Sequence, residues 1–363
     1  MTDNTDHRSA LRSRSLDLLR YPLALVVLTV HLRGVHTHLM IDYAPWLWRF
    51  IQAYLSGISV PVYFFIAGYV FFLNVNLTRE TYLRKMRNRF HSLFIPYVAW
   101  NMLAFAVACA RGRIEFNGMA DMGRELWYAL VGAPGGLSYP ADGPMWFVRD
   151  LMVMAAASPL LAWIFRHKGA WCIAVMGVIW ANPATRHLGS WQLETAAFFF
   201  SWGAWMSFGG RDMMHELRRY RVAALIVYLA GSTAAYFLYG TGPSARAWCK
   251  TAGMLAGFVL AYNIAATCVK RGHGRTAMRL APAAFFLYCS HNILLKSVGD
   301  IVYQAFAPLP QLLRSGSVLC GDSRCHHSHR HGHILCPAPL CAASARAVHG
   351  RPPVNNSPAC SFI

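Results

Sequence analysis

The sequence predicts an all-α fold, a polytopic bundle of about nine to ten transmembrane helices followed by an irregular, disordered C-terminal tail. Composition is the first indication. Hydrophobic residues make up 56% of the 363-residue chain and charged residues 13%, whereas soluble globular proteins carry about 25% charge. Long uncharged stretches are the second: no Asp, Glu, Lys or Arg lies between Arg49 and Arg79. A bilayer-spanning helix needs about 20 mostly apolar residues, so such stretches are expected to cross a membrane.

The candidate spans divide the chain into three regions. Nine segments are apolar enough to span, and the shortest is the fifth; they are 16–35, 50–78, 93–110, 145–165, 169–185, 192–209, 222–245, 251–269 and 280–306. We therefore expect a cytoplasmic N-terminal segment over residues 1–15 and a transmembrane domain over 16–310. An atypical tail rich in Cys, His and Pro covers 311–363.

Basic residues concentrate in alternate loops. The N-terminus and every second loop hold 18 Lys and Arg residues, against 7 in the intervening loops. Cytoplasmic loops of membrane proteins carry such an excess. We therefore expect a multi-pass protein of a bacterial cytoplasmic (inner) membrane with a cytoplasmic N-terminus. The net charge of +19 would suggest nucleic acid in a soluble protein, but here it follows topology, and no nucleic-acid partner is expected.

The tail has a different character. Residues 312–363 hold five of the ten Cys and six of the sixteen His, and no stretch of them could span a bilayer. Cys320, Cys325, Cys336 and Cys341 could be read as a zinc site. However, their C-x4-C spacing lacks the tight C-x2-C pair of most structural zinc sites. We expect no metal, and a disordered segment or an out-of-frame translation that replaces a genuine last span.

The first span carries two ionisable residues, Arg20 and His31. Eleven residues at 100° each make three turns plus about 20°, so both side chains lie on one helix face, about 16 Å apart along the axis. Arg20 could hold phosphates at the cytoplasmic rim, helped by the basic run YLRKMRNRF. His31 could then act as general base near the reactive end of the same ligand, because imidazole titrates near neutrality. A structural hydrogen bond for His31 and snorkelling for Arg20 are the alternatives.

Several segments in order resemble the acyltransferase-3 family of bacterial integral-membrane acyltransferases. SLDLLRYPLALVVLTVHL resembles the family's first helix, whose signature is an Arg, ten residues and a His. VPVYFFIAGYVFF resembles its second helix, although Ala67 and Tyr69 replace the usual residues. YLRKMRNRFHSLFIPYVAWN is similar to its basic loop, and MWFVRDL to the start of its fourth span. AAFFFSWGAWMSFG and AAFFLYCSHNILL resemble two later spans, and together the matches cover residues 15–305.

The resemblance implies transfer of an acyl group, commonly acetyl, from cytoplasmic acyl-CoA to a hydroxyl of a cell-envelope glycan. The lipid bilayer, acyl-CoA and a glycan or lipid-linked glycan are then the partners; acyl-CoA is a co-substrate, and no permanently bound cofactor is expected. His31 would be the catalytic residue, and Arg20, Lys85 and Arg89 would contact the donor. The family ordinarily has at least one more helix where this chain has its tail.

Other polar residues in or beside the spans each have two possible roles. Tyr288 and His291 could bind the acceptor or support a helix contact, and Glu194 could be a second acid–base group or a surface residue. Neighbouring helix positions point to different faces, so Arg149 and Asp150 are expected to pair with other groups or to flank the entry of the fourth span.

Two alternative functions remain open at this point. A membrane-bound O-acyltransferase of the other class uses one His in an apolar late helix, which would be His291, with His31 structural. A transporter or flippase of an envelope intermediate would carry out no group transfer. Transporters often consist of two matched halves with interrupted helices, and no such repeat is evident.

Overall fold

The computed structural model describes residues 2–31, 45–73, 78–114, 116–132, 139–183, 193–211 and 213–306. All regular elements in these ranges are helices and none is a strand, which confirms the all-α prediction. The tail, 311–363, lies outside the described residues, and so does its possible zinc site.

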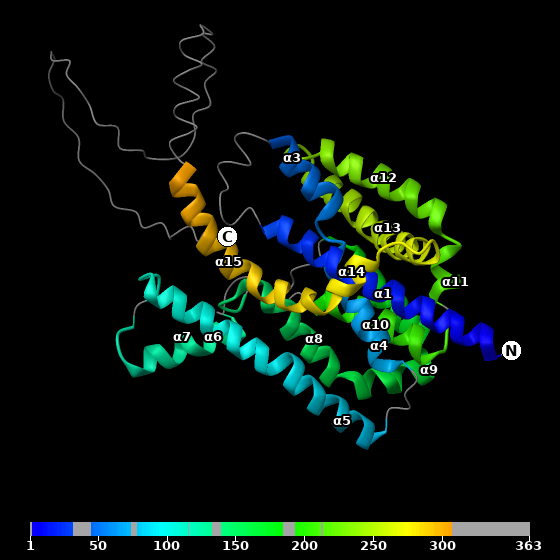
Figure 1. Ribbon diagram of the computed structural model, residues 1–363, viewed down its shortest axis with the longest axis horizontal. Helices are drawn as coiled ribbons and strands as arrows, with labels where there is room; N and C mark the ends of the chain where they lie inside the picture. Colours follow the sequence, from blue (N-terminus) through cyan, green and yellow to red (C-terminus); the bar gives the residue numbers. More distant parts are fainter. Residues whose placement is uncertain are drawn as a thin grey trace, which may run out of the picture. The chain divides into compact units, whose positions relative to one another are not determined.

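The helices follow one another through short connections (Figure 1). In chain order they are α1 (Thr2–His31), α3 (Pro45–Phe50), η2 (Ile51–Leu55), α4 (Ser59–Phe72), α5 (Arg79–Arg89), η3 (Phe90–Phe94), α6 (Ile95–Ala110), α7 (Met119–Val131), η4 (Gly143–Met145), α8 (Trp146–Ala156), α9 (Ser158–Ala181), α10 (Leu193–Phe208), α11 (Met213–Arg218), α12 (Arg221–Phe237), α13 (Pro243–Lys270), α14 (Arg275–Leu280), η5 (Ala281–Ala283) and α15 (Ala284–Phe306).

Three helical segments are long and apolar enough to cross a membrane: Trp46–Phe72, Arg79–Ala110 and Pro243–Lys270. A fourth is possible if the bent pair Gly143–Ala156 and Ser158–Ala181, which meet at 60°, forms one span, and Arg221–Phe237 is a shorter apolar helix. Among the described residues, length and composition thus identify three or four spans, and the predicted count of nine to ten is not confirmed. The chain is nevertheless a helical membrane protein.

Several predicted boundaries can be compared with the helices. The third and eighth candidate spans fall within two of the long apolar segments, and the second overlaps the segment Trp46–Phe72. The predicted break between the fourth and fifth spans falls at Lys168, where the backbone of α9 leaves helical geometry (φ −136°, ψ 26°). A second break at Ala157, between α8 and α9, was not predicted. Pro159 at the start of α9 accounts for it, because proline is tolerated in the first turn of a helix but not in its interior.

Helices α4 and α10 cross at backbone contact in the middle of the bundle. A Cβ atom on Gly68 would lie 2.0 Å from the carbonyl oxygen of Phe200, and one on Gly203 would lie 2.1 Å from that of Phe65. Both obstacles are backbone atoms, so only glycine fits at either position. Around this crossing lie fully buried aromatic side chains; they are Phe64, Phe65, Phe71, Phe72, Phe199, Phe200 and Phe258.

Helices α12 and α13 also pack closely through small residues (Figure 1). A Cβ on Gly231 would lie 2.8 Å from the carbonyl oxygen of Cys249, and one on Gly253 would lie 3.0 Å from the hydroxyl of Ser232. Small residues at helix contacts are typical of membrane proteins, because close approach maximises van der Waals packing where no hydrophobic effect drives association.

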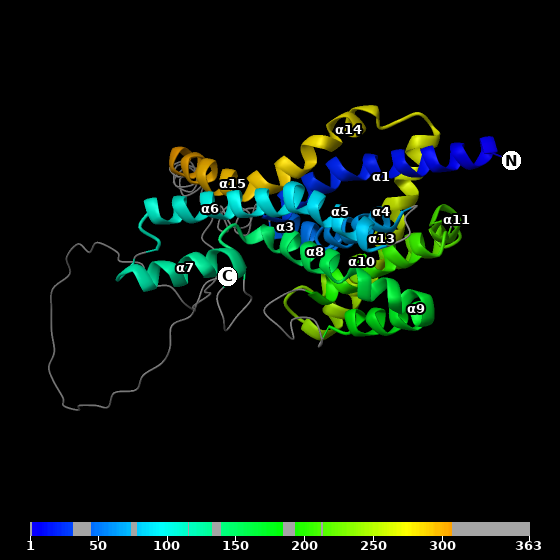
Figure 2. The same ribbon diagram turned by 90° about the horizontal axis from the view of Figure 1, so that it is seen from below.

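Helix α1 lies along one side of the bundle with α14 and α15, whereas α9 lies on the opposite side and α4 and α10 lie between them (Figure 2). Helix α1 contacts α13, α14, η5, α15 and α4. The residues of α1 that carry the predicted chemistry are therefore positioned by α4 and by helices from the last third of the chain.

The backbone contact between α4 and α10 generates a prediction. Gly68→Ala or Gly203→Ala should lower the melting temperature of the purified protein by several degrees or prevent its folding, because the added methyl overlaps a carbonyl oxygen and overpacking costs about 1–3 kcal/mol or more. Thermal unfolding in detergent, followed by tryptophan fluorescence, measures the effect.

Gly123→Ala is the matched control for this prediction. Gly123 lies within α7, and its Cβ would meet nothing within 4 Å. Alanine favours helix over glycine by about 1 kcal/mol, so this variant should be as stable as the wild type or slightly more so. Equal stability of all three variants would contradict the close contact.

Candidate active site

Arg20 lies at the edge of a cavity of about 270 Å³. Its guanidinium is 3.2 Å from the carboxylate of Asp17, one turn earlier on α1, and both side chains are about 40% exposed. The hydroxyl of Tyr63, from α4, donates a hydrogen bond to the backbone carbonyl of Arg20. Phe147 of α8 and Tyr288 of α15 complete the aromatic wall of the cavity. With Phe285 of α15, the cavity thus combines one cation with four aromatic rings.

His31, at the last position of α1, lies against α15. Its ring centroid is 5.0 Å from that of His291, and the rings are tilted by 51°. The ring of His291 is in turn 5.8 Å from that of Tyr288. Because Tyr288 also lines the Arg20 cavity, its ring lies between the cavity and the two imidazoles. The structure therefore brings Arg20 and His31 to the same neighbouring helix.

His291 is buried, with 2% of its surface exposed. Its Nδ1 lies 2.5 Å from the backbone carbonyl oxygen of Tyr288. A carbonyl oxygen can only accept, so Nδ1 carries the hydrogen, and in the neutral ring Nε2 is the acceptor nitrogen. That Nε2 is buried and, within the part of the chain that the structure describes, has no hydrogen-bond partner. Buried polar atoms without partners are uncommon in proteins, and this one lies on the ring next to His31.

The other predicted donor-side cations are on α5. Arg89 is close enough to Arg20 for the two positive charges to repel each other, and Lys85 is similarly close to Arg89. The Lys85 ammonium also lies 4.9 Å from the centre of the Phe71 ring. The structure thus gathers Arg20, Lys85 and Arg89 into one electropositive region.

Glu194 lies elsewhere in the fold. It is a half-buried residue in the first turn of α10, and its charge acts on Asp150 of α8. The structure therefore associates Glu194 with the buried Arg149–Asp150 pair.

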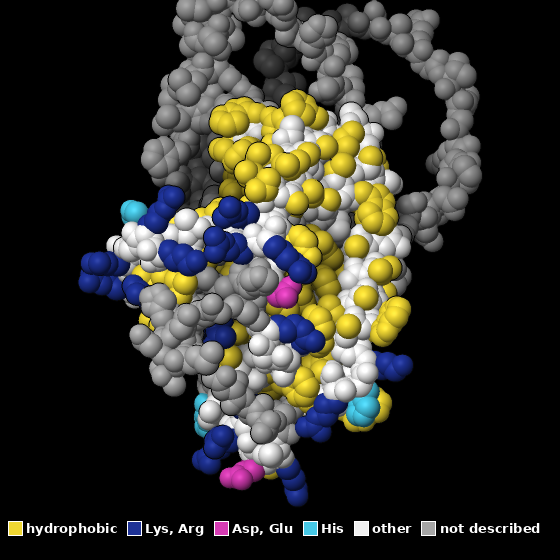
Figure 3. All heavy atoms as spheres, turned by 90° about the vertical axis from the view of Figure 1, so that its right-hand side faces the viewer, with side chains coloured by type: hydrophobic (Ala, Val, Ile, Leu, Met, Phe, Trp, Pro, Cys, Tyr) yellow, Lys and Arg dark blue, Asp and Glu magenta, His cyan; other side chains and the backbone are white. Residues whose placement is uncertain are grey.

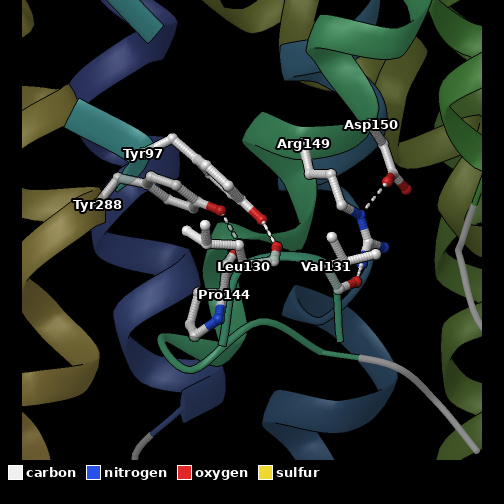
Figure 4. Close-up of polar contacts among 7 residues, drawn as sticks. All are labelled: Tyr97, Leu130, Val131, Pro144, Arg149, Asp150 and Tyr288. Carbon is white, nitrogen blue, oxygen red and sulfur yellow. Dashed lines mark hydrogen bonds and ion pairs between the residues drawn. The ribbon is translucent and has the colours of Figure 1, made fainter. Parts of the chain in front are cut away.

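Three buried side chains from three helices hold the connection between α7 and α8 (Figure 4). The hydroxyls of Tyr97 and Tyr288 donate to the carbonyls of Leu130 and Pro144. Arg149 donates from Nη1 to the carbonyl of Val131 over 2.8 Å. Each bond satisfies a backbone carbonyl that a membrane interior would otherwise leave without a partner. The connection is therefore fixed at both ends, next to the Arg20 cavity.

Arg149 binds another group, the Val131 carbonyl, as expected, but it also pairs with Asp150, which was not expected. Arg149 Nε is 3.0 Å from Asp150 Oδ1, and both side chains are buried. The expectation considered only the directions of the Cα–Cβ bonds. The long stem of arginine bends back across the 100° between neighbouring positions, so the guanidinium reaches the adjacent carboxylate.

A second polar chain, centred on Asp142, was missed by sequence reasoning. The backbone N–H of Asp142 donates to Asn101 Oδ1 over 2.9 Å, and Asn292 Nδ2 donates to Asp142 Oδ1 over 2.8 Å. Through Asp142, Asn101 of α6 is thereby linked to Asn292 of α15. In the sequence, Asp142 stands out only as an acidic residue in a short connection rich in Gly and Pro. Nothing local in the sequence indicates its contact with Asn292 of α15, 150 positions away.

Arg20 and Tyr288 thus line one cavity, and the rings of Tyr288, His291 and His31 are in successive contact. A cation at a cavity rim can bind phosphate, and imidazole nitrogens further in can accept and return a proton. Among the described residues, no group of three or more His, Cys, Asp or Glu side chains could hold a metal ion. The region fits transfer of a group from an anionic donor.

Comparison with known proteins identifies the class. A family model described as an acyltransferase domain matches residues 13–320. The chain belongs to this acyltransferase-3 family, as its motifs indicated, and is a membrane acyltransferase.

One relative is the succinoglycan biosynthesis protein ExoH of Rhizobium meliloti (strain 1021). It is 27% identical over 261 residues, which cover 69% of this chain and 68% of the relative. No solved structure matches the chain.

The buried ion pair generates a prediction. Arg149→Met should destabilise the protein by about 3–5 kcal/mol, because it leaves the Asp150 carboxylate buried without its partner. Adding Asp150→Asn in the same chain should restore part of that loss, since an amide is cheaper to bury than a carboxylate. Urea or thermal unfolding of both variants gives the comparison, and a double variant no more stable than Arg149→Met would contradict it.

Proposed function

We propose that this acyltransferase transfers an acyl group, commonly acetyl, from acyl-CoA on the cytoplasmic side to a hydroxyl of a cell-envelope glycan. The observation that carries the proposal is the arrangement of α1 against α15. Arg20 and Tyr288 line one cavity, and the rings of Tyr288, His291 and His31 follow one another beyond it. An elongated donor could thus place a phosphate at Arg20 and its thioester near His31.

The chemistry requires one proton acceptor. His31 removes the proton from the acceptor hydroxyl while that oxygen attacks the thioester carbonyl carbon. The carbon–sulfur bond then breaks, the new ester forms, and the thiolate of CoA leaves and takes up the proton from the imidazolium. General acid–base catalysis of this kind contributes about 10²–10⁴-fold to a rate.

A polysaccharide acceptor is supported by the relative, whose name assigns it to succinoglycan biosynthesis. A lipid-linked glycan has the same acceptor hydroxyl at the membrane surface. An inner membrane with a cytoplasmic N-terminus is supported by the positive loops, since it puts Arg20, Lys85 and Arg89 on the side where acyl-CoA is found. The acyltransferase family leaves no support for a transporter without group transfer.

His291 is the alternative base. Its Nε2 is the nitrogen that lacks a hydrogen in the neutral ring, and it is buried without a partner. In that case one His in a late helix would be the base, as in the other class of membrane-bound acyltransferase, and His31 would have a structural role beside it. The two assignments predict different consequences of substitution.

His31→Ala should lower the turnover number about 10²–10⁴-fold, the contribution of a general base, while donor affinity changes little. His291→Ala should lower it less than about tenfold if it only supports His31. Release of CoA thiol by the purified protein, with acetyl-CoA and envelope glycan, measures turnover. The reverse order of the two effects would make His291 the base.

Arg20→Ala should raise the KM for acyl-CoA about tenfold or more, because a hydrogen bond to a charged group contributes about 1.5–3 kcal/mol. Arg20→Lys should recover part of the affinity, because it keeps the charge but not the two-pronged geometry. Arg87→Ala, an exposed cation of the same basic run, is the control and should leave the KM unchanged. An equal rise in both Ala variants would indicate only a general charge effect.

The reaction itself can be tested in cells. Mass spectrometry of envelope glycans from cells with and without the gene should show the mass of one acyl group on the wild-type glycan. The same increment should be lost in cells that carry His31→Ala. An unchanged glycan mass would refute the glycan acceptor.

A further inference from the structure

A second cavity lies at the end of α13, away from the candidate active site. It encloses about 270 Å³ and is lined by residues of α11, α12 and α13 and of the turn after α13. Four of the residues that line it are cations, and none is an acid; the cations are Arg218, Arg221, Lys270 and Arg271. The floor contains Asn263, whose amide donates to the carbonyls of Leu217 and Val259 and so ties α13 to α11.

The four cations have no acidic partner among the described residues. No ion pair joins Arg218, Arg221, Lys270 or Arg271 to any described carboxylate. The acid on the neighbouring helix, Glu216, pairs with Arg219 at 3.0 Å instead. Like charges around one cavity repel one another, so an anionic ligand between them would be stabilised.

A third cavity adjoins this one through Lys270. It encloses about 360 Å³ and includes Arg14 of α1 and Arg275 of α14. In Figure 3 Lys and Arg side chains gather on the corresponding face of the molecule, with little acidic side chain among them and a broad apolar area beside them. The excess of Lys and Arg is therefore a property of this end of the bundle. An anionic ligand could bind these cations in either of the two cavities.

Exposed apolar side chains lie on the two long helices that line the cavity. On α12, Val222 is next to Arg221 in the chain and Ile226 follows five residues after Arg221; they are 61% and 63% exposed, and Ile264 of α13 is 60% exposed. None of the three lines the cavity, and Ile264, six residues before Lys270, lies on a different face of α13. The cations therefore lie at helix ends and the exposed apolar side chains further along the same helices, which is the polarity of a phospholipid.

We propose that the cavity formed by Arg218, Arg221, Lys270 and Arg271 binds the phosphate of an anionic phospholipid, whose acyl chains lie against the exposed apolar faces of α12 and α13. Basic pockets between transmembrane helices bind such headgroups, and guanidinium groups bind phosphate through two parallel hydrogen bonds. A water-soluble phosphate would meet the same cations but would make no use of the exposed apolar side chains. The site is separate from the Arg20 cavity, because the two cavities share no lining residue.

The test uses the full chain purified in detergent, with native mass spectrometry of added phosphatidylglycerol and phosphatidylcholine. The wild type should bind phosphatidylglycerol at least about tenfold more tightly than phosphatidylcholine, in keeping with about 1 kcal/mol for each basic residue near an anionic headgroup. A variant with all four cations changed to Ala should lose this preference. All four positions are exposed, so the variant should elute as the same species in size-exclusion chromatography.

A matched control removes the same charge from exposed positions that line neither cavity: Arg79→Ala, Arg84→Ala, Arg87→Ala and Arg166→Ala together. This control should keep the preference for phosphatidylglycerol. An equal loss in both quadruple variants would show that only net charge matters and would overturn the proposal.

Two soluble competitors distinguish lipid from other phosphates. Glycerol 3-phosphate and coenzyme A carry phosphate without the lipid's acyl chains, and both should fail to displace phosphatidylglycerol at concentrations about a hundredfold higher. Displacement by coenzyme A that disappears in the cavity variant would assign the cavity to the acyl donor instead and refute the lipid site. Displacement by glycerol 3-phosphate would make it a site for soluble phosphate.

Discussion

Helices α4 and α10 meet at backbone contact through Gly68 and Gly203, and the placement of the other helices depends on this crossing. In a membrane interior the gain from association is mainly van der Waals packing, so the separation of two helices is set by their smallest facing residues. The crossing fixes the depth and rotation of α4. Five residues before Gly68, Tyr63 then holds the backbone of α1 at Arg20, and α1 in turn carries His31 to His291.

The candidate active site is consequently a junction between helices remote in sequence. Its polar groups are nearly all engaged in holding the chain itself: the Tyr288 hydroxyl binds a backbone carbonyl, and His291 Nδ1 faces another. Rigid support of this kind is needed because a general base must be held within hydrogen-bond reach of the hydroxyl that it deprotonates. His291 Nε2, which has no partner among the described residues, belongs to the ring that lies 5.0 Å from that of His31.

Charge divides the molecule into functionally different parts. Within the bundle Arg149 and Asp150 neutralise each other, because an isolated charge is costly in a low-dielectric interior. At the end of the bundle that includes the N-terminal half of α1 and the C-terminus of α13, cations line two cavities whose described lining contains no acid. Excess positive charge there is compatible with the positive-inside rule, and the proposed lipid site depends on it.

The sequence by itself determined the all-α class, the membrane environment, the family and the placement of Arg20 and His31 on one helix, because uncharged length and helical periodicity are local properties. The break at Lys168 was also local and was predicted. Only the tertiary structure decided which groups meet: His31 with His291, Asp142 with Asn292, and Arg149 with its own neighbour. These contacts depend on helix crossings set by packing between distant segments, and on the bending of long side chains, neither of which leaves a periodic signal in the sequence.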